Sequence, residues 1–293
     1  MIKLSDVSKL YERHVAVRNL NLEVRAGEIM GIIGHNGAGK SSTLKMIAGL
    51  IAPFSGVVEV MGHDMSQNRG TPEIKKKIGF LPEESALYAN MTVLEYLTFF
   101  GELYEMPKKQ TLTRIEELLT GLNLPERTKL TGELSKGMKR KVAIARVLLH
   151  DPDLLILDEP NSGLDPLTSF FILNYLKELR NQGKTILLSA HNLFHVESVC
   201  DRVTILKDGR LLISDTMPAI RSTLGHREYE VLFHTSQVLD YPLVDGYYRV
   251  RTGDLNELSA LLQQISAEQW QLVNLSVQES ALEEIYVKLS TLA

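Results

Sequence analysis

The sequence of 293 residues predicts an α/β fold with a mainly parallel sheet flanked by helices. Short apolar runs that end in glycine or acidic residues alternate with longer segments of helical periodicity, the pattern typical of βαβ units. The apolar fraction of 44% and the charged fraction of 23% are those of an ordinary globular protein. A chain of this length and composition can bury a sizeable core.

The elements of the first 213 residues follow from these two periodicities. Residues 28–34 form an apolar run that ends in a glycine-rich turn, and this pattern predicts a buried strand. The other predicted elements are helices at 41–50, 92–104, 112–119, 136–149 and 167–180, strands at 154–157 and 185–189, and a hairpin at 203–213 that turns at Asp208-Gly209.

The charge balance changes near Met217-Pro218. Residues 218–293 hold five basic and ten acidic residues, a net charge of −5, whereas residues 1–217 have a net charge of +1. We therefore predict two domains with these bounds. In the second domain, strands near 229–233, 247–251 and 271–277 and helices at 255–265 and 280–289 predict a small α+β unit.

Composition also excludes several classes of protein. The net charge of −4 argues against a general nucleic-acid binder, so no nucleic-acid partner is expected. Cys200 is the single cysteine, which rules out an intrachain disulfide and fits a reducing compartment. We expect no signal peptide and no membrane span, because the first residues lack an apolar core and no run of 18 apolar residues occurs. Any membrane part of the function is expected from another polypeptide.

A glycine-rich loop follows the first predicted strand and matches the pattern G-x-x-x-x-G-K-[ST]. Its residues are Gly34, His35, Asn36, Gly37, Ala38, Gly39, Lys40 and Ser41, and Ser42 comes next. Such a loop points backbone N–H groups at phosphates, and the helix that follows adds its positive end. Lys40 is expected at the β and γ phosphates and Ser41 on Mg²⁺. A turn without a ligand is the alternative, and the strand–loop–helix context argues against it.

Two carboxylates follow the apolar run at residues 154–157. The carboxyl ends of parallel strands share one edge of the sheet, so Asp158 and Glu159 are expected beside the phosphate loop. Asp158 is then placed to hold Mg²⁺, and Glu159 to orient and deprotonate an attacking water. The alternative is a strand that runs into an acidic loop with no role in binding. The presence of a phosphate loop in the same chain argues against this alternative.

Further motifs fall in a fixed order around these two. Leu134-Ser135-Lys136-Gly137-Met138 precedes a basic helix, Ser162-Gly163-Leu164-Asp165 follows the acidic pair, and His191 ends a predicted strand. In this order the chain resembles the nucleotide-binding subunit of ATP-binding-cassette (ABC) transporters over residues 1 to about 217. The resemblance implies a P-loop NTPase core with an antiparallel β subdomain and a helical subdomain at about 85–149.

The resemblance also implies a role for each motif. Ser135 and Gly137 would bind the γ-phosphate of ATP held by an opposite subunit, and Asp165 would link the two sites of a homodimer or heterodimer. His191 would bond the γ-phosphate and report its presence. Tyr11 would stack on adenine, and the alternative is a tyrosine that is only packed between a strand and a loop. For Ser135, the alternative to γ-phosphate binding is a plain helix N-cap. Glu83 stands where the family has a glutamine that contacts the metal or the attacking water.

The sequence departs from the broad family pattern at three positions. Lys136 and Met138 replace a glycine and a glutamine of the signature loop, and Glu83 places a carboxylate near the metal. These departures, together with the end of the tail at 282–289, resemble a subgroup of exporters of drugs, antibiotics, sodium or polysaccharides. The helical segment is expected to receive a short helix of the permease, and its apolar residues Tyr96, Leu97, Phe99 and Phe100 are candidates for that contact. Core packing is the expected role of most of these four.

The resemblance predicts an ATPase subunit that uses ATP and Mg²⁺ to power export through an integral-membrane permease subunit. Its expected location is peripheral, on the cytoplasmic face of the inner (cell) membrane. The alternative is a soluble ABC-type ATPase with a regulatory or nucleic-acid-related role and no transport. The role of residues 218–293 stays open at this point, since regulation, dimerisation, ligand sensing and capping of the core are all compatible with a small α+β unit.

Overall fold

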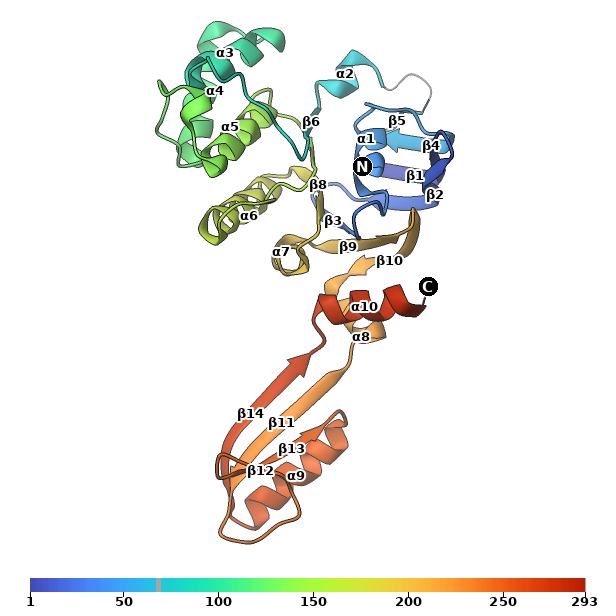
Figure 1. Ribbon diagram of the computed structural model, residues 1–293, viewed down its shortest axis with the longest axis vertical. Coiled ribbons are helices and arrows are strands. Elements are labelled where there is room, and N and C mark those ends of the chain that lie inside the picture. The colour runs from blue at the N-terminus through green and yellow to red at the C-terminus, as the bar shows by residue number, and fades with distance from the viewer. Residues whose placement is uncertain (67–69, 293) are drawn as a thin grey trace. The chain divides into compact units, whose positions relative to one another are not determined.

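The computed structural model describes residues 1–66 and 70–292, and the chain divides into two units, Met1–Thr216 and Met217–Ala293. The first unit holds a four-stranded antiparallel sheet, a six-stranded mainly parallel sheet and a group of helices (Figure 1). The second unit holds one further four-stranded antiparallel sheet with its own helices. The predicted α/β class with a mainly parallel sheet is confirmed.

The central sheet has the strand order β10-β9-β3-β8-β7-β6. All of its neighbouring strands pair in parallel except β10, which forms an antiparallel hairpin with β9. Its strands are β3 (Ile29–Ile33), β6 (Ile78–Leu81), β7 (Leu154–Leu157), β8 (Thr185–Ala190), β9 (Arg202–Lys207) and β10 (Arg210–Thr216). Every residue of β3 and β7 is buried, because layers of structure cover both faces of a parallel sheet.

The antiparallel sheet has the order β2-β1-β4-β5, with strands β1 (Ile2–Tyr11), β2 (His14–Val24), β4 (Ser55–Val60) and β5 (His63–Asp64). Ile2, Leu4 and Val7 of β1 point into a core shared with Met30 and Ile32 of β3. The same core includes apolar residues of helix α1 (Lys40–Ile47). This sheet therefore buttresses the strand and the helix that flank the glycine-rich loop.

Helices surround the central sheet. In Figure 1, α3 (Val93–Leu103), α4 (Lys108–Gly121) and α5 (Lys136–Leu148) lie together, away from β1, β2, β4 and β5. Thr92 caps α3 with a full capping box, in which its side chain accepts from Glu95 N and Glu95 bonds back to Thr92 N. The remaining helical elements of this unit are α2 (Pro72–Lys75), the short 3₁₀ turn at Thr131–Glu133, α6 (Pro166–Asn181) and α7 (Leu193–Val199).

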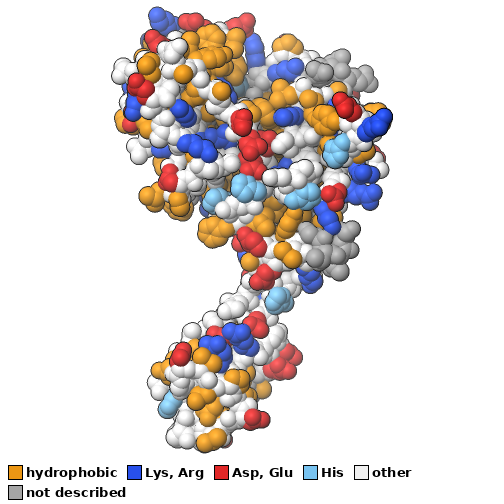
Figure 2. All heavy atoms as spheres, viewed as in Figure 1, with side chains coloured by type: hydrophobic (Ala, Val, Ile, Leu, Met, Phe, Trp, Pro, Cys, Tyr) orange, Lys and Arg blue, Asp and Glu red, His pale blue; other side chains and the backbone are white. Residues whose placement is uncertain are grey.

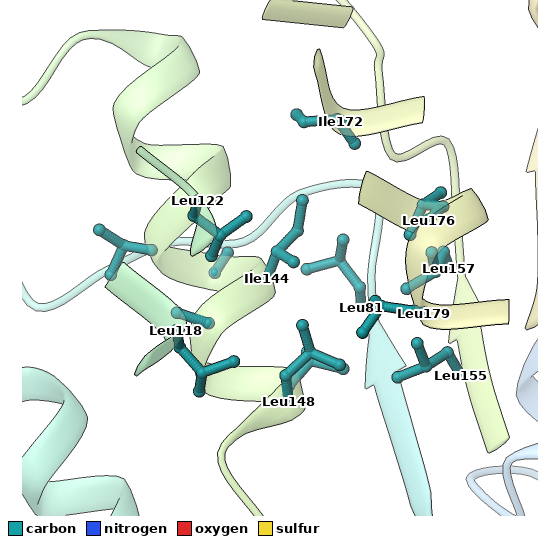
Figure 3. Close-up of a cluster of buried hydrophobic side chains, with 14 of the residues drawn as sticks. Leu81, Leu118, Leu122, Ile144, Leu148, Leu155, Leu157, Ile172, Leu176 and Leu179 are labelled. Carbon is teal, nitrogen blue, oxygen red and sulfur yellow. The ribbon is translucent and has the colours of Figure 1, made fainter. Parts of the chain in front are cut away.

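A leucine-rich core joins the helical group to the sheet. Figure 3 shows this cluster, in which side chains of α4 and α5 meet those of β6, β7 and α6. Its labelled members are Leu81, Leu118, Leu122, Ile144, Leu148, Leu155, Leu157, Ile172, Leu176 and Leu179. Truncating a buried leucine costs about 2–5 kcal/mol, so a cluster of this size holds the helical group firmly to the sheet.

The unit that begins at Met217 has the strand order β12-β13-β11-β14. Its elements are α8 (Met217–Leu224), β11 (Arg227–His234), β12 (Leu243–Val244), β13 (Tyr247–Thr252), α9 (Leu255–Ala267), β14 (Gln271–Glu279) and α10 (Leu282–Leu292). Phe233 and Trp270 stack at 5.1 Å inside its core, against apolar residues of α9. The strands and helices expected here from the sequence are present, and α8 and β12 are additions to them.

Within the described residues, the structure contains no helix that combines the length and the apolar character needed to cross a bilayer.

Cys200 caps the end of α7 and packs against β3, so closely that a Cβ on Gly31 would lie 2.8 Å from its Sγ. Burial raises the pKa of the Cys200 thiol well above its usual range. The thiol therefore stays protonated at pH 8.5, and since the thiolate is the reactive form, we expect negligible alkylation of the folded protein by iodoacetamide. Mass spectrometry checks this, with guanidinium-unfolded protein as the reactive control; rapid native labelling would contradict it.

Candidate functional site

The glycine-rich loop connects β3 to α1 and wraps tightly. Gly39 has φ +99°, and a Cβ there would lie 2.5 Å from Ala16 O, so only glycine fits this position. Ala38 N donates to His35 O at 3.1 Å inside the loop, and Gly209 N of the β9–β10 turn donates to Ala38 O at 3.2 Å. The loop is therefore fixed both by a hydrogen bond within its own turn and by a hydrogen bond from the β9–β10 turn.

Lys40 is the first residue of α1, and its side chain folds back over the loop. It is only 6% exposed, and its Nζ donates to Gly34 O at 2.7 Å and to His35 O at 3.2 Å. Nζ also lies 4.0 Å from Glu159 Oε1. A buried ammonium group is costly unless anions compensate it, so this position favours a negatively charged ligand.

Asp158 and Glu159 follow β7, and Ser189 of β8 fixes both. Ser189 Oγ donates to Asp158 Oδ1 at 2.6 Å and accepts from Glu159 N at 2.9 Å. Glu159 has φ +46°, a left-handed conformation that is unfavourable for a residue with a side chain. Both carboxylate residues are almost fully buried.

His191 stands just after β8, and its Nδ1 contacts Glu159 Oε2 directly. Its side chain is 59% exposed, whereas that of Glu159 is 9% exposed. Lys40, Glu159 and His191 thus come from three separate segments and meet at the carboxyl edge of the sheet. Figure 2 shows acidic and histidine side chains near the middle of the visible face of this unit. Buried charges and an exposed imidazole at one point can bind a polyphosphate and accept a proton from water.

Tyr11, at the end of β1, lies close to the start of α1. Ser42 Oγ bonds Tyr11 OH at 3.4 Å, and Lys9 Nζ lies 5.1 Å from the ring centroid. The ring is 42% exposed. It therefore offers an accessible aromatic face beside the helix that follows the loop.

Ser135, Gly137 and Asp165 form a second group. Ser135 caps α5 by accepting from Met138 N at 3.2 Å, and Asp165 caps α6 by accepting from Thr168 N at 2.9 Å. The hydrogen bonds from Thr168 hold the pKa of Asp165 below its usual value. Both residues are exposed, and within the described part of the chain no side-chain hydrogen bond or ion pair joins either of them to Lys40, Glu159 or His191. A Cβ on Gly137 would lie 3.1 Å from Thr168 Cγ2, so the two helix starts are neighbours.

Glu83 follows β6 and is exposed. Its backbone carbonyl accepts from Arg140 Nη1 at 3.0 Å, and Arg140 Nη2 also bonds Asp158 O at 3.0 Å. One guanidinium thus ties the segment that carries Glu83 to the acidic pair.

Arg140 and Ser189 are positions that sequence analysis did not single out. A signal for Arg140 is present, because it lies three, four and seven residues before Ala143, Ile144 and Val147 on the buried face of α5. A charged residue on an apolar stripe needs buried partners. Ser189 carries no comparable signal, since a serine at a strand end is common.

Comparison with known proteins places these motifs in context. A family model described as "ABC transporter" matches residues 17–162, and one described as an AAA domain matches residues 131–197. The ATP-binding protein NatA of Bacillus subtilis is 36% identical over 81% of this chain and 98% of its own length. The bacitracin transport ATP-binding protein BcrA of Bacillus licheniformis is 34% identical over 99% of this chain and 97% of its own. The linearmycin resistance protein LnrL of Bacillus subtilis is 32% identical, covering 99% and 98%.

Solved structures agree with the sequence relatives. An ATP-binding subunit of an ABC transporter superposes with a TM-score of 0.69 at 33% identity, covering 76% of this chain and 92% of its own. A dimeric ATP-binding cassette in a post-hydrolysis state with ADP and Pi gives a TM-score of 0.68 at 29% identity, with coverages of 74% and 99%.

Proposed function

Because the chain belongs to the ABC transporter family of ATP-binding proteins, we propose that it powers export of a substrate through a separate permease. It is an ATPase, and ATP is its nucleotide. The observation that carries the proposal is the meeting of Lys40, Glu159 and His191 at one edge of the sheet. This arrangement supports phosphate binding and water activation at a single point.

ATP binds along the glycine-rich loop. N–H groups of the loop other than that of Ala38, which donates to His35 O, face the phosphates together with the amino-terminal end of α1. Lys40 reaches the β and γ phosphates. Tyr11 stacks on adenine, a contact for which its exposed ring beside Ser42 is suited.

Mg²⁺ accompanies the nucleotide, and the residues present fit it. No group of three or more His, Cys, Asp or Glu side chains able to hold a metal occurs among the described residues. Mg²⁺ bound to a nucleotide needs only one or two carboxylates, since phosphates and waters complete its shell. Ser41, Asp158 and Glu83 are the protein groups that would hold it. When bound, Mg²⁺ offsets the negative charge of the phosphates.

Glu159 acts as the general base. It accepts a proton from the attacking water as the water oxygen bonds the γ-phosphorus, and the bond from that phosphorus to the oxygen of ADP breaks. His191, held by Glu159 Oε2, bonds the γ-phosphate. Lys40 offsets charge that develops on the leaving group. Glu83, a carboxylate where a neutral amide is usual, adds negative charge near the metal.

A second ATP-binding chain completes each site. Ser135, Gly137 and Asp165 are exposed or half-buried and lie apart from their own chain's Lys40, which leaves them available to a partner. Two ATP molecules are then sandwiched between the chains, and loss of the γ-phosphate opens the dimer. One complete set of motifs permits a homodimer, and a paralogue would make a heterodimer. Lys136, which reaches Gly163, and Met138, which packs on the helical core, modify this surface.

The permease docks on the helical group. An apolar patch on this group consists of Tyr88, Phe99 and Leu103, whose side chains are 53%, 39% and 65% exposed. The rings of Tyr88 and Phe99 lie 5.9 Å apart. Exposed apolar residues gathered in this way favour a protein partner. The chain would thus sit peripherally on the cytoplasmic face of the cell membrane, and residues 218–293 would form an accessory domain.

Purification of the tagged full chain from detergent-solubilised membranes of its native cell tests this function. We expect a multi-spanning membrane protein in near-stoichiometric amount. The double substitution Tyr88→Ser with Phe99→Ser should lose it while retaining ATP binding, because the patch lies outside the nucleotide residues. Phe54→Ser, which alters an even more accessible ring at 70% exposure, is the control and should retain the partner.

The opposite result favours the alternative function. Co-purification of ribosomes or nucleic acid, or of soluble proteins alone, would replace the transport function by that of a soluble ABC-type ATPase.

A further inference from the structure

The guanidinium of Arg140, a residue of α5, lies at the carboxyl edge of the central sheet, among the backbone groups that follow β6 and β7. The residue is 8% exposed, and all three of its nitrogens donate to backbone carbonyl oxygens. The bonds run from Nε to Pro160 O at 2.8 Å, from Nη1 to Pro82 O and Glu83 O at 3.0 Å each, and from Nη2 to Asp158 O at 3.0 Å and Glu159 O at 2.8 Å.

These five carbonyls belong to two loops. Pro82 and Glu83 follow β6, whereas residues 158–160 follow β7, the strand next to it in the sheet. Carbonyls beyond the strand ends have no ladder partner, so a planar fork of donors can serve both loops at once. Arg140 therefore holds the two loops to each other and to α5.

The charge of the guanidinium is maintained at this buried position. Burial lowers the pKa of Arg140 to about 10, and the nearby carboxylates, Asp158 first and then Glu83, oppose that shift. The side chain is consequently protonated at neutral pH, when all five bonds can form.

The backbone of Glu159 explains why such a clamp is needed. Its left-handed conformation, φ +46°, is strained and persists only where the surroundings impose it. Ser189 Oγ accepts from Glu159 N at 2.9 Å, and Arg140 Nη2 donates to Glu159 O at 2.8 Å. Both peptide groups of the residue are thereby pinned, which aims its carboxylate at Lys40 and His191.

We propose that Arg140 is a positioning residue for ATP hydrolysis, which fixes the strained Glu159 peptide and ties it to the Glu83 loop and α5. The inference rests on the proposed role of Glu159 as general base. Since α5 begins next to Ser135, any displacement of this helix start by a partner chain is transmitted through Arg140 to Glu159. The recorded hydrogen-bond acceptors of the guanidinium are all backbone carbonyl oxygens, so it acts through the residues that it holds.

Arg140→Gln and Arg140→Lys test the proposal. We expect kcat of the full chain to fall about ten-fold or more, because a general base contributes 10²–10⁴-fold and is now misplaced. KM and the affinity for a fluorescent ATP analogue should stay within about three-fold, because the glycine-rich loop does not involve Arg140. The lysine variant keeps the charge, and it provides a folded protein if the glutamine variant does not fold.

Arg202→Gln is the matched control. Arg202 is also a largely buried arginine that donates to a backbone carbonyl, Glu23 O at 3.2 Å. It is the first residue of β9, so it lies at the amino-terminal ends of the parallel strands, away from the carboxyl edge. We expect this variant to lower thermal stability without lowering kcat. A purely structural role of Arg140 predicts the same behaviour for its own variants, and unchanged kcat in folded Arg140→Lys and Arg140→Gln would overturn the proposal.

A double-mutant cycle separates this inference from the role of Glu159. If Arg140 acts through Glu159, adding Arg140→Gln to Glu159→Gln leaves the residual single-turnover rate unchanged. Independent action multiplies the two losses, and that result would refute the positioning role. Retention of hydrolysis by Glu159→Gln alone would instead refute the proposed general base, so the two failures give different patterns.

Discussion

Replacing Glu159 by glutamine is expected to abolish steady-state ATP hydrolysis while ATP still binds. Glutamine has the same shape as glutamate and would stay beside Lys40 and His191. It cannot act as a base toward water, however, because it carries an amide instead of a carboxylate. Loss of a general base lowers kcat by about 10²–10⁴-fold. Phosphate release assays and titration with a fluorescent ATP analogue measure the two quantities separately.

The same variant should accumulate as a dimer locked by ATP. With hydrolysis blocked, the γ-phosphate stays and keeps its contacts to both chains, so light scattering should report twice the monomer mass when ATP and Mg²⁺ are added. Glu178→Gln, an exposed carboxylate on α6, is the matched control and should behave as the native chain. A Glu159→Gln chain that hydrolyses ATP normally and stays monomeric would remove Glu159 from catalysis and favour an ATP-binding regulator.

Replacing Lys40 by alanine is expected to weaken ATP binding by about 10²-fold or more. Hydrogen bonds to charged groups contribute about 1.5–3 kcal/mol each, and Lys40 is placed to make two of them to the β and γ phosphates. The buried ammonium group also lies 4.0 Å from Glu159 Oε1. Calorimetric titration with ATP and Mg²⁺ measures the loss directly.

Lys45→Ala controls for the loss of charge in general. Lys45 stands in the last turn of the same helix, remote from the glycine-rich loop. We expect its affinity for ATP to match that of the native chain. Native affinity in a folded Lys40→Ala protein would show that phosphate binding relies on the backbone N–H groups and the helix end alone.

Strands β3 and β7 of the central sheet could be predicted because they are short and apolar and are followed by glycine or an acidic residue. Strand β6 was not predicted, since Gly79 leaves only three larger apolar residues in its four positions. The long strands β1 and β2 were harder to recognise. Left-handed residues at Asp6 and Asn19 and several register shifts between the two strands interrupt their alternation, so no continuous period of two runs through them. Helix α4 begins at Lys108, four residues before the predicted start at 112. The prediction missed this first turn because its residues are polar and no side chain caps it.

The proximity of Lys40, Glu159 and His191 also follows from sequence, since strand ends of a parallel sheet share an edge. The clamp of Arg140 does not, because it depends on β6 and β7 being neighbours and on where α5 packs. The assigned roles of Ser135, Gly137, Asp165, Tyr11 and Glu83 stay predictions. Those of Ser135, Gly137 and Asp165 involve a second chain, and those of Tyr11 and Glu83 involve bound nucleotide or metal.

The strand order of the central sheet has a consequence for biosynthesis. β3, which leads into the glycine-rich loop, lies between β8 and β9, with Ile29 paired to Ile186 and Met30 to Arg202. A ribosome therefore delivers β3 early and both of its neighbours more than 150 residues later. Until then five consecutive apolar residues lack their partners, and nascent chains are prone to aggregate at such exposed segments. ATP can consequently stabilise the first unit only after translation has passed β9.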